Sequence, residues 1–184
     1  MTFENYLQLF EDILNHPENH PTYQDEEYYQ YTKMNWARMG RWIKRFEPTS
    51  AFEQFVKSIA EKQQWIIITE PWCGDAAHSV PMLAKMAAQN PNVTVDIQLR
   101  DSAPFLIDSY LTNGGKSIPI LVIRDENGQD LAVWGPRPAA CQELFLKLKE
   151  QGMDFSGIKE EIQKWYNTDK GVAIQQEIQS VLEK

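Results

Sequence analysis

A short apolar run in the middle of the chain, Trp65-Ile66-Ile67-Ile68-Thr69, limits most strongly what this sequence can fold into. Its β-branched residues favour a strand, and a strand without polar alternation is typically covered on both faces. The run ends at Glu70-Pro71-Trp72-Cys73-Gly74-Asp75, and a helical pattern follows to about Gln89. A covered strand that leads into a helix indicates an α/β protein.

Three further strands are expected after this helix. Apolar residues alternate from Val93 to Leu99, which predicts a second strand, parallel to the first because a right-handed helical crossover joins them. Residues 119–123 and 131–134 predict an antiparallel hairpin around Asp125-Glu126-Asn127-Gly128. The sequence therefore predicts an α/β fold with one four-stranded mixed sheet flanked by helices.

Helical periodicity continues beyond the sheet at both ends of the chain. Two amphipathic helices are expected before Pro48, the second covering Asp25 to Phe46, and two more after Gly152. In the central part, Ser50-x-x-Glu53 is a capping-box signature for a first helix. We expect an N-terminal helical extension (1–47), a central domain (48–150) and a C-terminal helical extension (151–184) that form one compact unit.

Composition excludes several function classes. Among 184 residues, 26 acids against 18 bases give a net charge of −8, which argues against sequence-independent nucleic-acid binding. The longest strongly apolar run is far shorter than the roughly 20 residues of a membrane span, and Met1 to Asn5 does not resemble a secretory signal. Two cysteines do not make a disulfide framework. We expect a cytoplasmic protein with reduced thiols and no nucleic-acid or membrane partner, and its oligomeric state stays open.

Cys73 is the strongest candidate for chemistry. It follows a strand and opens a helix, where free N–H groups and a partial positive charge stabilise a thiolate. Trp72 offers a flat contact surface, and Gly74 allows the backbone of a partner to approach closely. The alternative is an inert buried cysteine, which the polar loop around Cys73 disfavours.

These residues resemble the active-site motif of the thioredoxin-like superfamily. Trp72-Cys73-Gly74 is similar to the start of Trp-Cys-Gly-Pro-Cys, and Pro81 lies where that family's active-site helix has its kinking proline. Ile118-Pro119 is similar to the Ile–cis-Pro pair that faces the thiol, and Gly128 fits the turn between the last two strands.

The resemblance covers about residues 50–150 and is strongest to a bacterial branch with a single-cysteine Trp-Cys-Gly-Asp-Ala motif. It implies a thioredoxin-like fold with Cys73 as the catalytic nucleophile. The substrate-binding residues that it implies are Trp72, Gly74, Asp75, Ile118 and Pro119.

Three departures from the thioredoxin pattern bear on activity. Ala76 replaces the second cysteine, so Cys73 cannot close a disulfide within the motif, a step that dithiol reduction requires. Asp75 replaces the motif proline, and a carboxylate near the sulfur opposes thiolate formation. Ile67 replaces the acid that thioredoxins bury in the preceding strand.

Other sulfur and metal chemistry is less favoured. Cys141 is a conceivable resolving thiol, but we expect it in a helix on the far side of the sheet, as an ordinary helical cysteine. Cys73, Asp75 and His78 lack a fourth metal ligand, and His78 is expected on the surface of its helix. We therefore expect no metal and no cofactor.

The basic stretch Arg38, Arg41 and Arg45 has two interpretations. It forms either a solvated helix face paired with the acidic first helix, or an anion-binding face that lies over Cys73.

Three functional hypotheses follow. The first is a monothiol redox protein in which Cys73 forms a mixed disulfide with a protein or a low-molecular-weight thiol, and an external thiol resolves it. The second is a catalytically inactive thioredoxin-fold binding or regulatory module. The third is a transferase acting on small thiol adducts, with Arg38, Arg41 or Arg45 holding a carboxylate.

Overall fold

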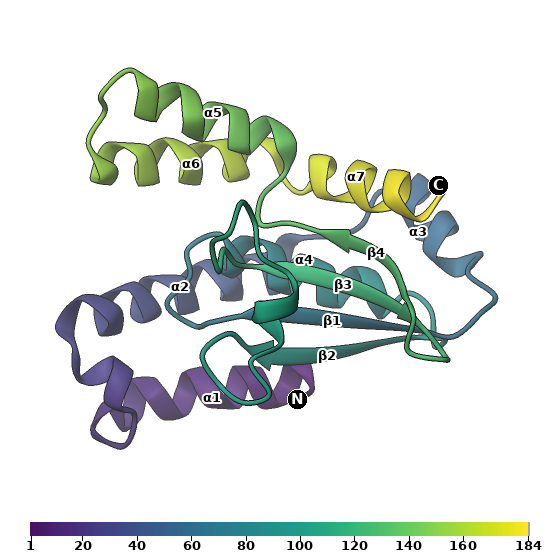
Figure 1. Cartoon of the computed structure of the whole chain (residues 1–184), viewed down its shortest axis with the longest axis horizontal. Coiled ribbons are helices and arrows are strands. Elements are labelled where there is room, and N and C mark those ends of the chain that lie inside the picture. The colour runs from purple at the N-terminus through teal and green to yellow at the C-terminus, as the bar shows by residue number, and fades with distance from the viewer. Residues whose placement is uncertain (184) are drawn as a thin grey trace.

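A four-stranded sheet lies at the centre of the computed structural model, which describes residues 1–183 (Figure 1). Its strands are β1 (Gln63–Thr69), β2 (Val93–Leu99), β3 (Ile120–Asp125) and β4 (Asp130–Trp134). They lie in the order β2-β1-β3-β4. β1 is parallel to β2 and antiparallel to β3, and β3 is antiparallel to β4. The predicted α/β fold with a mixed four-stranded sheet is confirmed.

Seven α-helices surround the sheet within the described range. They are α1 (Phe3–Asn15), α2 (Glu26–Arg45), α3 (Ser50–Lys57), α4 (Ala76–Ala87), α5 (Ala139–Glu150), α6 (Phe155–Asp169) and α7 (Val172–Leu182). Three 3-10 turns cover Pro17–Asn19, Pro21–Gln24 and Leu106–Ser109. In residues 1–183 no helix combines the length and the apolar character that crossing a membrane requires.

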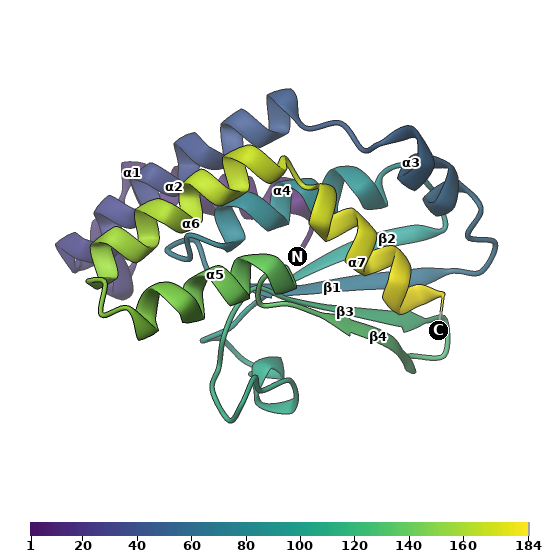
Figure 2. The ribbon, with the colours of Figure 1, turned by 90° about the horizontal axis from the view of Figure 1, so that it is seen from above.

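The apolar run of β1 lies in the interior, as its composition predicts. Trp65, Ile67 and Ile68 are fully buried, and α4 packs against both β1 and β2. The C-terminal helix α7 packs against β4 (Figure 2). This burial holds the carboxyl end of β1, where Cys73 follows, in a fixed position.

Local capping explains where the helices begin. Asp25 accepts hydrogen bonds from the backbone N–H groups of Glu27 and Tyr28, and it starts α2 where the sequence predicts. The predicted capping box of α3, which begins at Ser50, is wrong by one residue. Thr49, and not Ser50, accepts a hydrogen bond from the N–H of Phe52 at 3.3 Å. A side-chain oxygen of this kind is the usual N-terminal cap of a helix.

Helices from both ends of the chain pack on the central elements. α1 packs against α2 and β2, α2 against α4, and α5 against α6 (Figures 1 and 2). The backbone of Met1 continues the edge of the sheet, because its carbonyl accepts a hydrogen bond from Ile97 of β2 at 2.7 Å.

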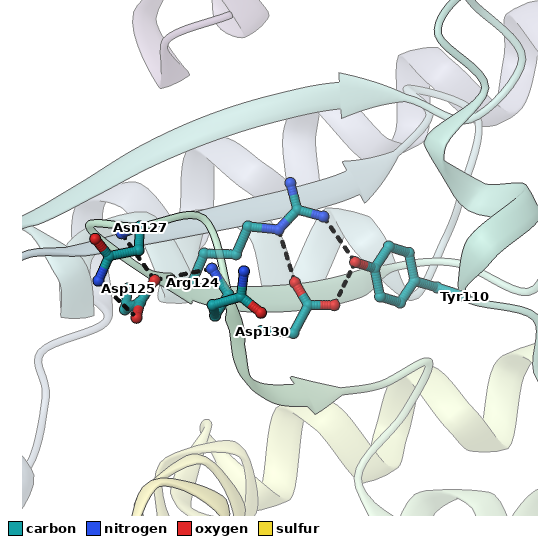
Figure 3. A network of polar contacts seen from close by, with 6 residues as sticks. Tyr110, Arg124, Asp125, Asn127 and Asp130 are labelled. Atoms are coloured by element: carbon teal, nitrogen blue, oxygen red, sulfur yellow. Dashed lines mark hydrogen bonds and ion pairs between the residues drawn. The ribbon is translucent and has the colours of Figure 1, made fainter.

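A polar network on the β3–β4 hairpin holds the segment that leads into β3 (Figure 3). Arg124 Nε donates to Asp130 Oδ1 at 2.7 Å and Arg124 Nη2 to the hydroxyl of Tyr110 at 2.8 Å, while that hydroxyl donates to Asp130 Oδ2 at 2.5 Å. Exposed ion pairs contribute little free energy. The network therefore acts mainly by fixing Tyr110, eight residues before Ile118.

We predict that Gly171→Ala destabilises the fold, because the added methyl group would clash with Met82 of α4 and with Phe46, which follows α2. Gly171 joins α6 to α7 at a φ of +82°, and an added Cβ would lie 2.7 Å from Met82 Sδ and 2.8 Å from Phe46 Cε2. Positive φ and overpacking together should lower the free energy of unfolding in urea by about 2–4 kcal/mol. Gly152, at a φ of +75° between α5 and α6, has open space around its Cβ position. Gly152→Ala should cost about 1 kcal/mol, and equal costs at both positions would contradict the packing argument.

Candidate functional site

The turn between β1 and α4 brings Cys73 next to a segment far away in the sequence. The N–H of Cys73 donates to the carbonyl of Glu70 at 3.1 Å, and the Cys73 carbonyl accepts from Ala77 of α4 at 3.1 Å. The thiol donates to the carbonyl oxygen of Ile118, with Sγ and O 3.4 Å apart. The Ile118–Pro119 peptide bond is cis.

Burial sets the protonation state of Cys73. The residue is 7% exposed, and this burial raises the pKa of its thiol to about 12. The carboxylate of Asp75 raises this pKa further, whereas the N–H groups of Ala76 and Asp75 and the charge of Arg137 lower it. Desolvation raises the pKa of Cys73 by more than the N–H groups at the start of the helix lower it, so the resting group is a neutral thiol.

Cys73 lines a cavity of about 830 Å³. Five of the six residues expected at the site share this cavity: Trp72, Cys73, Gly74, Asp75 and Ile118. Pro119 is buried and is not among the residues that line it. Side chains of α2 and α6 form other parts of the wall, so helices from both ends of the chain contribute to the site.

Asp75 is held by residues that the sequence did not single out. Its Oδ2 accepts from Arg137, whose Nε is 2.9 Å and Nη2 2.8 Å away. Its Oδ1 accepts from the hydroxyl of Tyr166 on α6 at 3.0 Å. Arg137 lies in the turn after β4, so three separate segments meet at this carboxylate.

Trp72 and the preceding proline are held mainly from α2. The carbonyl of Pro71 accepts a hydrogen bond from Asn35 Nδ2 at 2.9 Å. The ring of Tyr28 meets the Trp72 ring edge-on at 5.5 Å, and the guanidinium of Arg100 lies 4.6 Å from the Trp72 ring centroid. These contacts fix the orientation of the indole beside the cavity.

His78 is fully buried, which corrects its expected place on the helix surface. Its Nδ1 accepts a hydrogen bond from the indole N–H of Trp42 at 2.8 Å. Nε2 therefore carries the proton and donates to Oε1 of Gln163 at 2.6 Å. The imidazole stacks on Tyr166 with centroids 4.3 Å apart, and burial lowers its pKa to about 3. Both ring nitrogens are thus engaged in hydrogen bonds to side chains.

Cys141 lies in α5, the helix after the last strand, as expected, but not on the expected side of the sheet. It is fully buried near Asp75 and Tyr166, on the side of the molecule that carries the motif and not on the far side of the sheet. Burial and the Asp75 carboxylate raise the pKa of its thiol to about 12. Cys141 does not line the cavity, and both cysteines are free thiols.

Glu70 is a buried acid that the sequence analysis did not select. Its carboxylate accepts from the N–H of Asp101 at 2.9 Å, and burial raises its pKa to about 7. The signal available in the sequence was an acid placed directly after an uninterrupted apolar strand.

The basic stretch of α2 does not pair with α1 in residues 1–183. Arg38 lines the cavity, Arg41 donates to Asn167 of α6 and lies over the ring of Trp42, and Arg45 is exposed. Only the first of these three arginines is therefore placed near Cys73.

A family comparison agrees with the fold. The thioredoxin family model matches residues 22–153, about seven-tenths of the chain. This chain belongs to the thioredoxin family. The match begins before the first residue of the expected central domain (48–150) and therefore includes α2.

Two solved structures share the fold. One is a protein of unknown function from Pseudomonas aeruginosa, with a TM-score of 0.61 and 16% identity over 82% of this chain and 84% of that one. The other is an HIV epitope scaffold, with a TM-score of 0.58 and 14% identity over 84% of this chain and 90% of that one. A search of curated proteins finds no match.

We predict that His78 makes the fold sensitive to acid. Its pKa is lowered from 6.5 to about 3, so below pH 6.5 the unfolded chain takes up a proton that the folded chain does not bind. The free energy of unfolding should fall by up to about 1.4 kcal/mol per pH unit between pH 6.5 and 3 from this group alone.

Urea unfolding at pH 7, 6 and 5 checks this dependence. His78→Gln should be less stable at pH 7 and should show a flatter pH dependence than the unsubstituted protein. The matched change His16→Gln, at an exposed histidine, should keep the original slope. A slope unchanged in His78→Gln would show that His78 is not the titrating group.

Proposed function

We propose that this protein is a monothiol redox member of the thioredoxin family that acts through a mixed disulfide at Cys73. One observation supports this proposal best: Cys73 faces the 830 Å³ cavity, with its sulfur 3.4 Å from the carbonyl of Ile118. We further propose that the chain belongs to the bacterial branch with the Trp-Cys-Gly-Asp-Ala motif and acts in the cytoplasm.

The proposed reaction is a disulfide exchange. The Cys73 thiol loses its proton to water, and the thiolate attacks one sulfur of a disulfide R–S–S–R. A Cys73–S–S–R bond forms as the old S–S bond breaks, and the released RS⁻ takes up a proton. An external thiol R″SH then attacks the sulfur of the R group, which gives R–S–S–R″ and restores the Cys73 thiol. One disulfide enters and one leaves, so no further oxidant or reductant is needed.

The surroundings of Cys73 suit this exchange in two respects. Ala76 occupies the position of a second motif cysteine, so an external thiol has to resolve the mixed disulfide. The cationic Arg137 and the N–H groups of Asp75 and Ala76 favour the thiolate once its proton has left. Trp72, Gly74, Asp75, Ile118 and Pro119 are the proposed contacts of the entering molecule.

A second candidate is a binding or regulatory module without catalysis. The raised pKa of Cys73 favours it, because a thiol with a pKa of about 12 is almost entirely protonated at neutral pH. In that case the cavity would bind its partner without a covalent step.

We predict that a small neutral disulfide labels Cys73 selectively. After incubation of the folded protein with 2-hydroxyethyl disulfide at pH 8, peptide mass analysis should find the adduct on the Cys73 peptide. Cys141 should stay unlabelled because it is fully buried. Dithiothreitol should remove the adduct and restore the free thiol.

Two matched variants complete the test. Cys73→Ser should abolish labelling, and Cys141→Ser should keep it. Labelling of Cys73 only after unfolding would overturn the redox proposal and support the binding module.

A further inference from the structure

The cavity over Cys73 has the size of a small-molecule site. Its volume of about 830 Å³ lies within the roughly 300–1,000 Å³ of typical ligand pockets. Tyr28, Tyr31 and Arg38 of α2 form one part of its wall, and Phe155 and Lys159 of α6 form another. A molecule that fills this cavity and reaches Cys73 therefore also contacts α2 and α6.

The wall of this cavity is more basic than the chain as a whole. Five basic residues line it against three acidic ones, whereas the chain carries a net charge of −8. Three of the basic residues have carboxylate partners: Arg100 with Asp101, Lys116 with Asp108, and Arg137 with Asp75. Within residues 1–183, Arg38 and Lys159 have no carboxylate partner.

Arg38 places an unneutralised cation beside the motif. Its Nη1 donates to the neutral Oδ1 of Asn35 at 2.8 Å and lies 4.0 Å from the position a Cβ would take on Gly74. Arg38 is partly buried, and both this burial and the neighbouring Arg41 lower its pKa. An anion bound here would replace lost solvation and form a charge-assisted hydrogen bond.

Lys159 adds a second cation with aromatic surroundings. Its Nζ lies 4.0 Å from the ring centroid of Tyr31 and 4.3 Å from that of Phe155, and it donates to the Tyr31 hydroxyl. Cation–π contacts of this kind hold the ammonium in place without neutralising it. The acids of the wall that form no ion pair within residues 1–183, Glu27 and Glu160, are exposed, so water and salt screen their charges.

We propose that this cavity selects a small, carboxylate-bearing disulfide as the substrate, whose anion pairs with Arg38 and Lys159 while Cys73 exchanges with its sulfur. This proposal rests on the monothiol exchange described above and adds the class of substrate. The covalent step is unchanged: Cys73 bonds to one substrate sulfur, and the other leaves as a thiolate. Of the three arginines considered from the sequence, the structure assigns the role to Arg38 alone, and it adds Lys159.

The test compares two aromatic disulfides that differ in charge. The anionic probe is 5,5′-dithiobis(2-nitrobenzoate) and the neutral probe is 4,4′-dithiodipyridine, and both release a product that is followed by its absorbance. Second-order rate constants for Cys73 are measured at pH 8 and low salt in the Cys141→Ser background. Arg38→Met and Lys159→Met should each lower the rate with the anionic probe by about tenfold and leave the neutral probe nearly unchanged.

Three controls distinguish the loss of a positive charge in the cavity from a general disturbance of the structure. Arg45→Met removes an exposed arginine of the same helix and should change neither rate. Arg38→Lys should recover part of the loss, and high salt should reduce the advantage of the anionic probe in the unsubstituted protein.

The outcomes distinguish the two proposals. If both probes react with Cys73 and the ratio of their rates is the same in Arg38→Met, Lys159→Met and Arg45→Met, the anionic substrate class is wrong while the monothiol exchange stands. If neither probe reacts with Cys73 in the folded protein, the monothiol exchange fails, and the inference fails with it.

Discussion

The hydrogen bonds of His78 join α2 and α6 across α4, the helix that follows Cys73. Trp42 of α2 donates to one nitrogen of this imidazole, and the other nitrogen donates to Gln163 of α6. The ring is neutral and fully buried, so it is stable there only while both partners are present. This arrangement fixes α2 and α6 on the outer side of α4, and the walls of the cavity follow from it.

Enclosure by these helices changes the electrostatics of the thiol. A helix N-terminus lowers the pKa of a cysteine through its N–H groups, but here removal from water has the larger effect and raises it. The Asp75 carboxylate acts in the same direction, although Arg137 and Tyr166 bind it and thereby limit its influence. The sulfur is consequently a protonated group that donates to the Ile118 carbonyl.

Local sequence patterns were sufficient to predict the sheet, whereas the contact of Cys73 with Ile118 was expected only from the resemblance to the thioredoxin motif. The apolar run of β1, the alternation in β2 and the hairpin turn each depend on local patterns, and so does the cap of α2. The places of His78 and Cys141 could not be obtained in this way, because they depend on which helices cover α4 and α5. One signal was available: the residues Ala76 to Ala87 are small or apolar on nearly every side, which is typical of a helix buried all round.

Local sequence patterns also could not predict the partners of Asp75 or the second basic residue of the cavity, Lys159. Arg137 and Tyr166 lie 62 and 91 residues from Asp75, and Lys159 lies 128 residues from its contact Tyr31. Nothing in the composition of α6 distinguishes Lys159 from the exposed Lys164. Only the packing of α6 against the rest of the molecule places one of them in the cavity and the other in solvent.

The most direct test of this account is the rate of Cys73 alkylation by iodoacetamide as a function of pH. A neutral thiol in a cavity open to small molecules should react about tenfold faster for each pH unit, without a plateau below about pH 11. A plateau with a midpoint at or below about 8.5, the pKa of a free cysteine, would contradict the account. So would a folded protein in which Cys73 does not react at any pH.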